Sequence, residues 1–167
     1  MTVTTVHKDP QSLTMTITAE LDASVERAWQ LWADPRQLER WWGPPTYPAT
    51  FVDHDLAPGG RATYFMTGPD GDKSQGWWEV LAVEPPHRLE LNDGFADDTG
   101  APNEAMPTMV MVVTLADIEG GRTRMTIETR FPSLEAMDQL LAMGMEEGMA
   151  AALSQVDEIL GESSVSR

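Results

Sequence analysis

Residues 132–161 read PSLEAMDQLLAMGMEEGMAAALSQVDEILG and predict one long helix. Ser133 is the expected N-cap, Glu135 places a carboxylate in the first turn, and Gly161 is the expected stop. At about 1.5 Å per residue, this helix would be roughly 40 Å long. Apolar residues recur every three or four positions along it, at Leu134, Met137, Leu141, Met145, Met149, Leu153, Val156 and Leu160. Because most of the preceding chain reads as strands, we expect a sheet to cover this apolar stripe.

The middle of the stripe combines flexible and very small residues. Four methionines and two glycines occur there, at Met137, Met143, Met145, Met149, Gly144 and Gly148. Glycine costs about 1 kcal/mol relative to alanine inside a helix, and methionine fills irregular space. Two interpretations are open. The residues could allow close packing of the helix on the sheet, or they could leave a pocket that accepts apolar molecules of varied shape.

The chain before the helix alternates in the way that strands do. Residues 13–21 predict a first strand, and Val25, Ala28, Trp29 and Trp32 then form one face of a short helix. Asp34 followed by Pro35 starts a second short helix, which ends at Gly43. Further strands are expected at residues 51–56, 61–67, 76–83, 88–91, 108–115 and 123–131, and residues 92–107 read as a long mobile loop of the lid or binding type.

This order predicts an α+β fold in which a six- to seven-stranded antiparallel sheet wraps around a long C-terminal helix. Two short helices connect the first and second strands, and short turns connect the others. The 167 residues are enough for one domain with a proper core. We expect that domain at residues 13–162, with residues 1–12 as a polar N-terminal extension and residues 163–167 as a tail.

Composition excludes several classes of function. With 27 acidic and 11 basic residues, the net charge of −16 opposes binding to nucleic acids and to anionic membranes. There is no cysteine, so disulfides and thiolate chemistry are excluded. No secretion signal and no apolar run long enough for a membrane span occur, which favours a cytoplasmic protein.

Strand alternation predicts which side chains face the helix. If Leu56 points inward, Val52 and His54 do so as well. For residues 76–83, one register buries Trp78 and the other buries Glu79, and a bulge near Trp77 and Trp78 could satisfy both. We expect the pocket to be lined by Val52, His54, Leu56, Tyr64, Met66, Trp78, Met111, Val113, Met125, Ile127, Leu141, Met145 and Met149.

Three residues could take part in acid–base chemistry or hydrogen bonding in such a pocket: His54, Tyr64 and Glu79. His54 carries an imidazole, a group that suits acid–base work, although an inward histidine is more often a hydrogen-bonded core residue. Tyr64 offers a phenol donor or ordinary aromatic packing. Glu79 would orient His54 if it were buried, but a solvated position is favoured. No catalytic residue is assigned on this basis.

Metal and cofactor signals are weak. Asp70-Gly71-Asp72 is a fragment of a calcium-loop pattern that lacks the remaining ligands, so a turn is favoured. His7, His54 and His87 show no ligand spacing, and no phosphate loop occurs. We therefore expect neither a metal nor a cofactor. The tryptophans at positions 29, 32, 41 and 42 indicate core packing between the helices and the sheet, or one wall of the pocket.

Several short motifs follow one another along the chain. They are Ala28-Trp29, Asp34-Pro35, Leu38, Trp41-Trp42-Gly43-Pro44, Asp55-Leu56, Gly59-Gly60, Tyr64 to Met66, Glu84-Pro85-Pro86, Arg88-Leu89, Gly120-Gly121-Thr123, and Gly148-Met149 followed by Leu153 and Val156. Their order resembles that of the family named after the activator of the heat-shock-protein-90 ATPase. The resemblance implies the helix-grip fold of the START-related, birch-pollen-allergen-like superfamily. In that fold an antiparallel sheet grips a C-terminal helix around a cavity.

The resemblance leaves three functions open, because the family hosts different activities on one scaffold. Our leading hypothesis is a protein that binds a small apolar or aromatic molecule in an internal cavity, with a binding role favoured over an enzymatic one. The first alternative is a polyketide cyclase- or hydratase-like enzyme that uses the same cavity. The second alternative is a chaperone-associated domain that binds a protein partner. A monomer and a homodimer are both compatible with the sequence.

Overall fold

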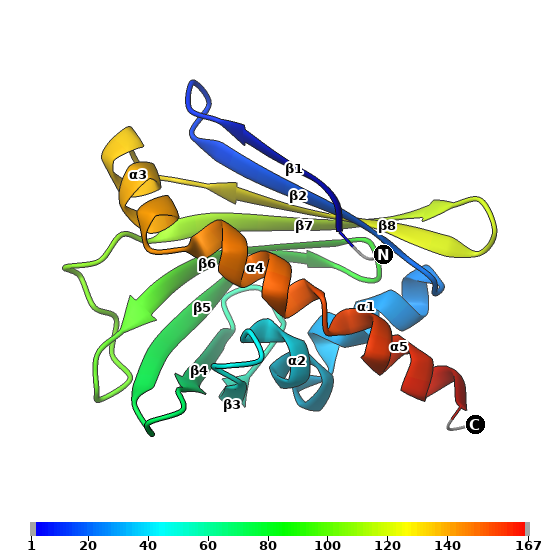
Figure 1. Ribbon diagram of the computed structural model, residues 1–167, viewed down its shortest axis with the longest axis horizontal. Coiled ribbons are helices and arrows are strands. Elements are labelled where there is room, and N and C mark those ends of the chain that lie inside the picture. The colour runs from blue at the N-terminus through cyan, green and yellow to red at the C-terminus, as the bar shows by residue number, and fades with distance from the viewer. Residues whose placement is uncertain (1–2, 166–167) are drawn as a thin grey trace.

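The computed structural model describes residues 3–165, which form one antiparallel sheet with helices on one face (Figure 1). The eight strands lie in the order β1-β2-β8-β7-β6-β5-β4-β3. They are β1 (Val3–Asp9), β2 (Thr14–Leu21), β3 (Ala49–His54), β4 (Arg61–Thr67), β5 (Lys73–Glu84), β6 (Arg88–Ala96), β7 (Met109–Ile118) and β8 (Arg122–Arg130). The helices are α1 (Val25–Ala33), α2 (Pro35–Trp42), α3 (Leu134–Ala142), α4 (Met145–Leu153) and α5 (Val156–Val165). The predicted α+β helix-grip fold is therefore confirmed.

The two short helices between β2 and β3 begin where the sequence predicts. The side chain of Ser24 accepts a hydrogen bond from the Arg27 amide and caps α1. The side chain of Asp34 caps α2 by accepting from the Arg36 amide, and Pro35 occupies the first turn. These caps orient both helices across the sheet, so that their tryptophans point into the core.

Four tryptophans from α1, α2 and β5 form the centre of that core. The ring centroids of Trp32 lie 4.8 Å from Trp41, 6.0 Å from Trp42 and 6.2 Å from Trp78. Trp32, Trp41 and Trp78 are fully buried. The prediction that the helical tryptophans pack in the core is confirmed, and Trp42 also faces a pocket described below.

The N-terminal residues form a strand that the sequence did not predict. Residues 3–9 were expected to belong to a polar extension, but they form β1 and pair with β2 at the edge of the sheet. An edge strand is held mainly by backbone hydrogen bonds, so it needs little apolar alternation. Val6 is the β1 side chain that packs against the core. The sheet consequently has eight strands rather than six or seven.

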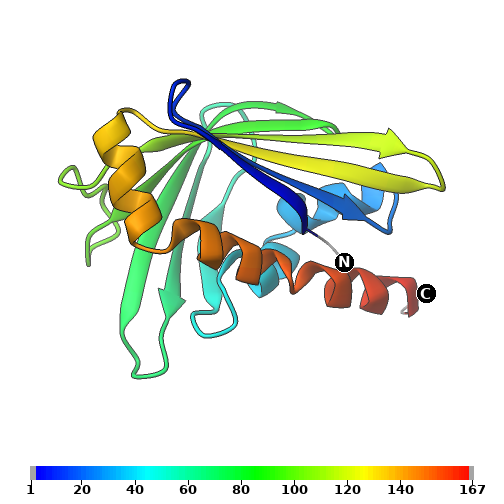
Figure 2. The same cartoon turned by 45° about the horizontal axis from the view of Figure 1, so that its top comes forward.

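The prediction of one continuous C-terminal helix is wrong, because two breaks divide it into α3, α4 and α5. Gly144 has a φ of 92°, in the left-handed region, and separates α3 from α4. Ser154 and Gln155 separate α4 from α5, and the Gln155 side chain donates to the Gly43 carbonyl at 2.7 Å. Gly161 lies inside α5 instead of ending the helix. In Figure 2 α3 turns away from the line of α4 and α5.

Replacing Gly144 by alanine is expected to lower the free energy of unfolding by about 1–2 kcal/mol, because an L side chain is strained at a left-handed φ. Denaturant unfolding measures the change. Gly161→Ala is the matched control: the residue lies inside a helix, and an added Cβ would meet open space, so this substitution is expected to add up to about 1 kcal/mol. Equal stabilisation by both substitutions would contradict the left-handed junction.

Candidate functional site

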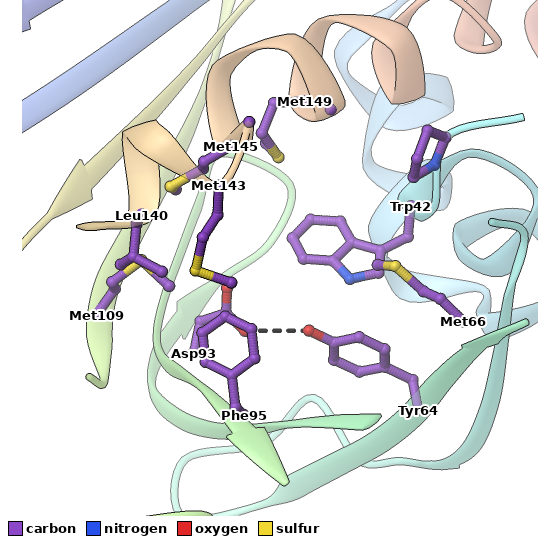
Figure 3. Close-up of a pocket in the computed structure, with 13 residues that line it drawn as sticks. Trp42, Tyr64, Met66, Asp93, Phe95, Met109, Leu140, Met143, Met145 and Met149 are labelled. Atoms are coloured by element: carbon purple, nitrogen blue, oxygen red, sulfur yellow. Dashed lines mark hydrogen bonds between the residues drawn. The ribbon is translucent and has the colours of Figure 1, made fainter. Parts of the chain in front are cut away.

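A pocket of about 280 Å³ lies between the sheet and the junction of α3 with α4 (Figure 3). Its walls come from α2, β4, β6, β7 and the two C-terminal helices α3 and α4. Most lining side chains are apolar, and many are methionines. The lining residues are Trp42, Pro44, Tyr64, Met66, Asp93, Phe95, Met109, Leu140, Met143, Gly144, Met145, Gly148 and Met149.

Strand pairing explains why Tyr64 and Asp93 meet in this pocket. Tyr64 on β4 pairs with Gly76 on β5, and Trp78 on β5 pairs with Asp93 on β6. A Cβ on Gly76 would overlap the Tyr64 ring. Because Gly76 has no side chain, the Tyr64 ring can lie over it. Tyr64 on β4 therefore reaches across β5 to Asp93 on β6.

The hydroxyl of Tyr64 donates a hydrogen bond to a carboxyl oxygen of Asp93 at 3.3 Å (Figure 3). Two buried indole N–H groups lie beside this pair. The indole N–H of Trp78 is directed at Asp93, and the indole N–H of Trp42 is directed at Tyr64. Neither indole N–H forms a hydrogen bond. The polar end of the pocket thus combines the Asp93 carboxyl group, the Tyr64 hydroxyl and the Trp42 indole, in otherwise apolar surroundings.

This environment changes the acidity of both titratable groups. Loss of water raises the pKa of Asp93 to about 7, although the hydrogen bond from Tyr64 and the nearby indole N–H of Trp78 oppose the rise. Desolvation and the neighbouring Asp93 raise the pKa of Tyr64 well above its usual value. None of the pocket-lining residues is Lys, Arg or His, so no positive side chain offsets the Asp93 charge there. Asp93 therefore exchanges its proton near neutral pH.

The structure brings only part of the predicted cavity residues to the pocket wall. Four of them, Tyr64, Met66, Met145 and Met149, line the pocket. Leu56 and Leu141 are half-buried and pack against the core. The remaining inward residues are buried in the core and do not line the pocket; they are Trp78, Met111, Val113, Met125 and Ile127. The pocket therefore occupies one end of the space between sheet and helices.

Val52 and His54 do not reach the pocket. The pairing of β3 with β4 shifts between Phe51 and Asp53, so Val52 lies in a bulge and is 67% exposed. Phe51 is buried in place of Val52. His54 is half-buried, and its Nε2 is hydrogen-bonded to the Trp32 carbonyl at 2.9 Å. That partner gives His54 a structural role in joining β3 to α1.

Glu79 lies on the face of β5 that points away from the pocket. The strand follows the register that buries Trp78 and Val80, and Glu79 accepts a hydrogen bond from Asn92 at 3.3 Å. A bulge is present, but it occurs at Leu81 and not near Trp77 and Trp78. Glu79 is therefore half-buried on the outer face of the sheet, which agrees better with the solvated position favoured by the sequence than with a catalytic role in the pocket.

The sequence reasoning missed Asp93. Residues 92–107 were expected to form a loop, whereas β6 continues to Ala96 and carries Asp93 on its inner face. A signal was present, because Leu89, Leu91 and Phe95 alternate as inward residues and Asp93 takes the position between them. The polar composition of the segment obscured this alternation. Trp42, Phe95, Met109, Leu140 and Met143 were also absent from the predicted lining.

Within residues 3–165, neither a cluster of metal-ligating side chains nor a helix that could span a membrane is found. No group of three or more His, Asp or Glu side chains in this range converges to hold a metal ion. The helices described there include none that is both long and apolar enough to cross a membrane.

Comparison with known proteins places these features in a family. A family model described as "Activator of Hsp90 ATPase homolog 1-like protein" matches residues 22–161. The chain is similar to the crystal structure of protein Ms6760 from Mycobacterium smegmatis, with 52% identity over 95% of this chain and 96% of that chain and a TM-score of 0.88. No curated protein matches the sequence.

Two further solved structures extend the comparison. A protein from Arthrobacter aurescens, solved by solution NMR, is 52% identical over 96% of this chain and 93% of that chain, with a TM-score of 0.92. A Silicibacter pomeroyi protein titled AHSA1 is 19% identical over 90% of this chain and 99% of that chain, with a TM-score of 0.73, and it supports the fold alone. The resemblance predicted from the sequence motifs is confirmed.

Proposed function

We propose that this chain, which belongs to the Activator of Hsp90 ATPase homolog 1-like family, binds a small, largely apolar molecule in the pocket between its sheet and the α3–α4 junction. The single observation that carries the proposal is a pocket of ligand size with apolar walls and one polar end, formed by Asp93 and Tyr64. Small-molecule sites in proteins share this combination of apolar surface and a few placed polar groups.

The volume limits the size of the ligand. An apolar cavity of about 150 Å³ is enough to hold benzene. The pocket here, at about 280 Å³, therefore suits a molecule with one or two rings or an aliphatic chain of similar bulk. Flexible methionine walls, supplied by Met66, Met109, Met145 and Met149, would adapt to several shapes. A cytoplasmic location stays a prediction from the sequence.

Filling the pocket is expected to remove binding. A Met145→Trp substitution adds bulk at the start of α4, and we expect it to weaken ligand affinity by at least about ten-fold while the protein stays folded. Native mass spectrometry first identifies molecules that co-purify with the protein, and isothermal titration calorimetry then compares affinities. Leu134→Trp is the matched control, because Leu134 is 49% exposed on α3 and does not line the pocket. Equal affinities of the two variants would contradict this binding site.

Acid–base catalysis is a second candidate function, and the Asp93–Tyr64 pair favours it. A carboxyl group with a pKa of about 7 can take up and release a proton at neutral pH, as cyclase or hydratase chemistry requires. His54 was the sequence-based choice for this role, but Asp93 lines the pocket and His54 does not. Loss or gain of water by a bound molecule, detected by mass spectrometry and absent in Asp93→Asn, is the expected result for an enzyme.

The third hypothesis, a chaperone-associated interaction domain, rests on the family description alone. Among the described residues, the large apolar side chains that are exposed lie at Val52 on β3, at Leu81 on β5, and at the two ends of α3, at Leu134 and Met143. Scattered exposed residues of this kind are normal on a monomer and do not form a docking patch. The structure therefore supports ligand binding more directly than protein docking.

A further inference from the structure

We propose that the ligand is a cationic amine with an apolar body, whose ammonium group pairs with the carboxylate of Asp93. The inference rests on the proposed binding function and names the chemical class of the ligand. Its starting point is the position of Asp93, an acidic side chain on the inner face of β6, in the wall of an apolar pocket.

The protein supplies neutral donors for this carboxylate but no counter-charge. Tyr64 donates to one oxygen, and the indole N–H of Trp78 is directed at the same group. Both donors favour the ionised form. No Lys, Arg or His lines the pocket, so the positive charge that would complete an ion pair has to come from the ligand.

The ligand's ammonium group and the Asp93 carboxylate contribute unequally to the desolvation cost of forming this ion pair. Burying an ion pair is usually expensive, because both charges lose water. Here the Asp93 side chain is half-buried in the pocket wall, so it has already lost part of its hydration in the folded protein. A bound ammonium group adds only its own loss of hydration, and it relieves an unfavourable charge that is present without it.

Aromatic rings surround the same end of the pocket. Trp42, Tyr64 and Phe95 line it together with Asp93, and Figure 3 shows Phe95 beside Asp93 in the view, with Tyr64 and Trp42 across from them. Aromatic faces attract cations, and the attraction grows when the cation is desolvated. The ring faces and the carboxylate therefore select the same kind of group.

The charge of the whole chain acts in the same direction. A net charge of −16 raises the local concentration of cations and repels anions. An anionic ligand of the same size would face both this repulsion and the unpaired Asp93 carboxylate. The apolar remainder of the pocket, formed by Met109, Met145 and Met149, would hold the ring or chain that carries the amine.

Protonation of Asp93 sets the pH dependence of binding. The groups that face Asp93 are Tyr64 from β4, Trp78 from β5, Met109 from β7, Trp42 from α2 and the methionines around the start of α4, and of these Tyr64 is the titratable one. Tyr64 stays neutral because its pKa is raised. Amine affinity is therefore expected to rise with pH as Asp93 ionises, across a range centred on about 7.

Three one-ring compounds that differ mainly in charge test the inference: benzylamine, benzyl alcohol and benzoate. Titration calorimetry at about pH 8 is expected to show that benzylamine binds at least about ten-fold more tightly than benzyl alcohol, and that benzoate binds most weakly. At about pH 5.5, where benzylamine stays charged and Asp93 is mostly protonated, the preference is expected to shrink by several-fold. Shifts of the Trp42 and Trp78 indole N–H signals in NMR spectra report binding in this pocket.

Two variants separate the local carboxylate from the general field of the protein. Asp93→Asn is expected to abolish the preference for benzylamine over benzyl alcohol. Asp70→Asn, in the exposed β4–β5 turn, removes the same charge and is expected to change nothing. A preference that survives Asp93→Asn, or tighter binding of benzyl alcohol or benzoate to the unmodified protein, would overturn the amine proposal alone. If Met145→Trp also fails to alter any affinity, or if none of the compounds binds, the proposed pocket function fails with it.

Discussion

Replacing Trp32 by alanine is expected to lower the free energy of unfolding by about 3–5 kcal/mol, the range typical of large aromatic residues in a core. Trp32 is fully buried, and its ring contacts those of Trp41, Trp42 and Trp78. Its indole N–H is directed at the sulfur of Met125 at 3.3 Å. Removal of the ring would leave a cavity where α1, α2 and the sheet meet, and neighbours held by this many contacts can collapse only partly.

Denaturant unfolding followed by circular dichroism measures this loss. Trp77→Ala is the control, because Trp77 is half-buried on the opposite face of β5 and its indole N–H donates to the Phe95 carbonyl. That variant is expected to lose about 1 kcal/mol, mainly from the hydrogen bond and partial burial. Similar losses for the two tryptophans would show that the cluster around Trp32 is not the centre of the core.

The elements that the sequence predicts well are those with strong local signals. Alternation defines β2, β7 and β8, and Asp34 followed by Pro35 defines the start of α2. Short turns between consecutive strands then favour antiparallel pairing, as observed. These signals fix the fold because each depends on residues close together in the sequence.

The features that the sequence does not predict depend on backbone geometry. A bulge reverses which side chains of a strand face the core. The bulges at Val52 and Leu81 lie in stretches where no residue type indicates a bulge. At Gly144 the left-handed conformation divides one apolar stripe into two helices. The stripe keeps its period across the break, so periodicity alone indicates a single helix.

The site is harder to predict than the fold for a related reason. Asp93 contributes to the pocket because it faces inward, yet its neighbours Asn92, Asp97 and Asp98 give the segment the composition of a loop. His54 drew attention because of its chemistry, although its partner is a backbone carbonyl of α1. In both cases the tertiary contacts decide the role, and residue type alone does not indicate them.

Asp93 is expected to destabilise the folded protein at neutral and higher pH. Its pKa is about 7 in the folded state, against about 3.9 in an unfolded chain. Below the unfolded value, both states hold the proton and there is no penalty. As pH rises from about 4 to about 7, the unfolded state releases its proton more readily than the folded state does, so the energetic penalty of Asp93 grows progressively. The separation of the two pKa values limits the total loss to no more than about 4 kcal/mol.

Asp93→Asn removes the charge and keeps an oxygen that can accept from Tyr64. The variant is therefore expected to match the unmodified protein at about pH 4 and to become more stable by about 1–4 kcal/mol at about pH 8. Denaturant unfolding across this range measures the difference, which isolates Asp93 from the other carboxylates. Asp97→Asn is the control: hydrogen bonds from Thr99 lower the pKa of Asp97, so its replacement is expected to give no gain as pH rises.

A gain that is the same at every pH would mean that Asp93 is not held in an unfavourable charged state. A gain that grows with pH would mean that the fold retains a costly carboxylate in its pocket wall, where asparagine would be more stable. Such a cost is characteristic of groups kept for binding or catalysis. The same measurement in saturating benzylamine is then expected to reduce the gain, because the bound ammonium group would offset the charge that destabilises the free protein.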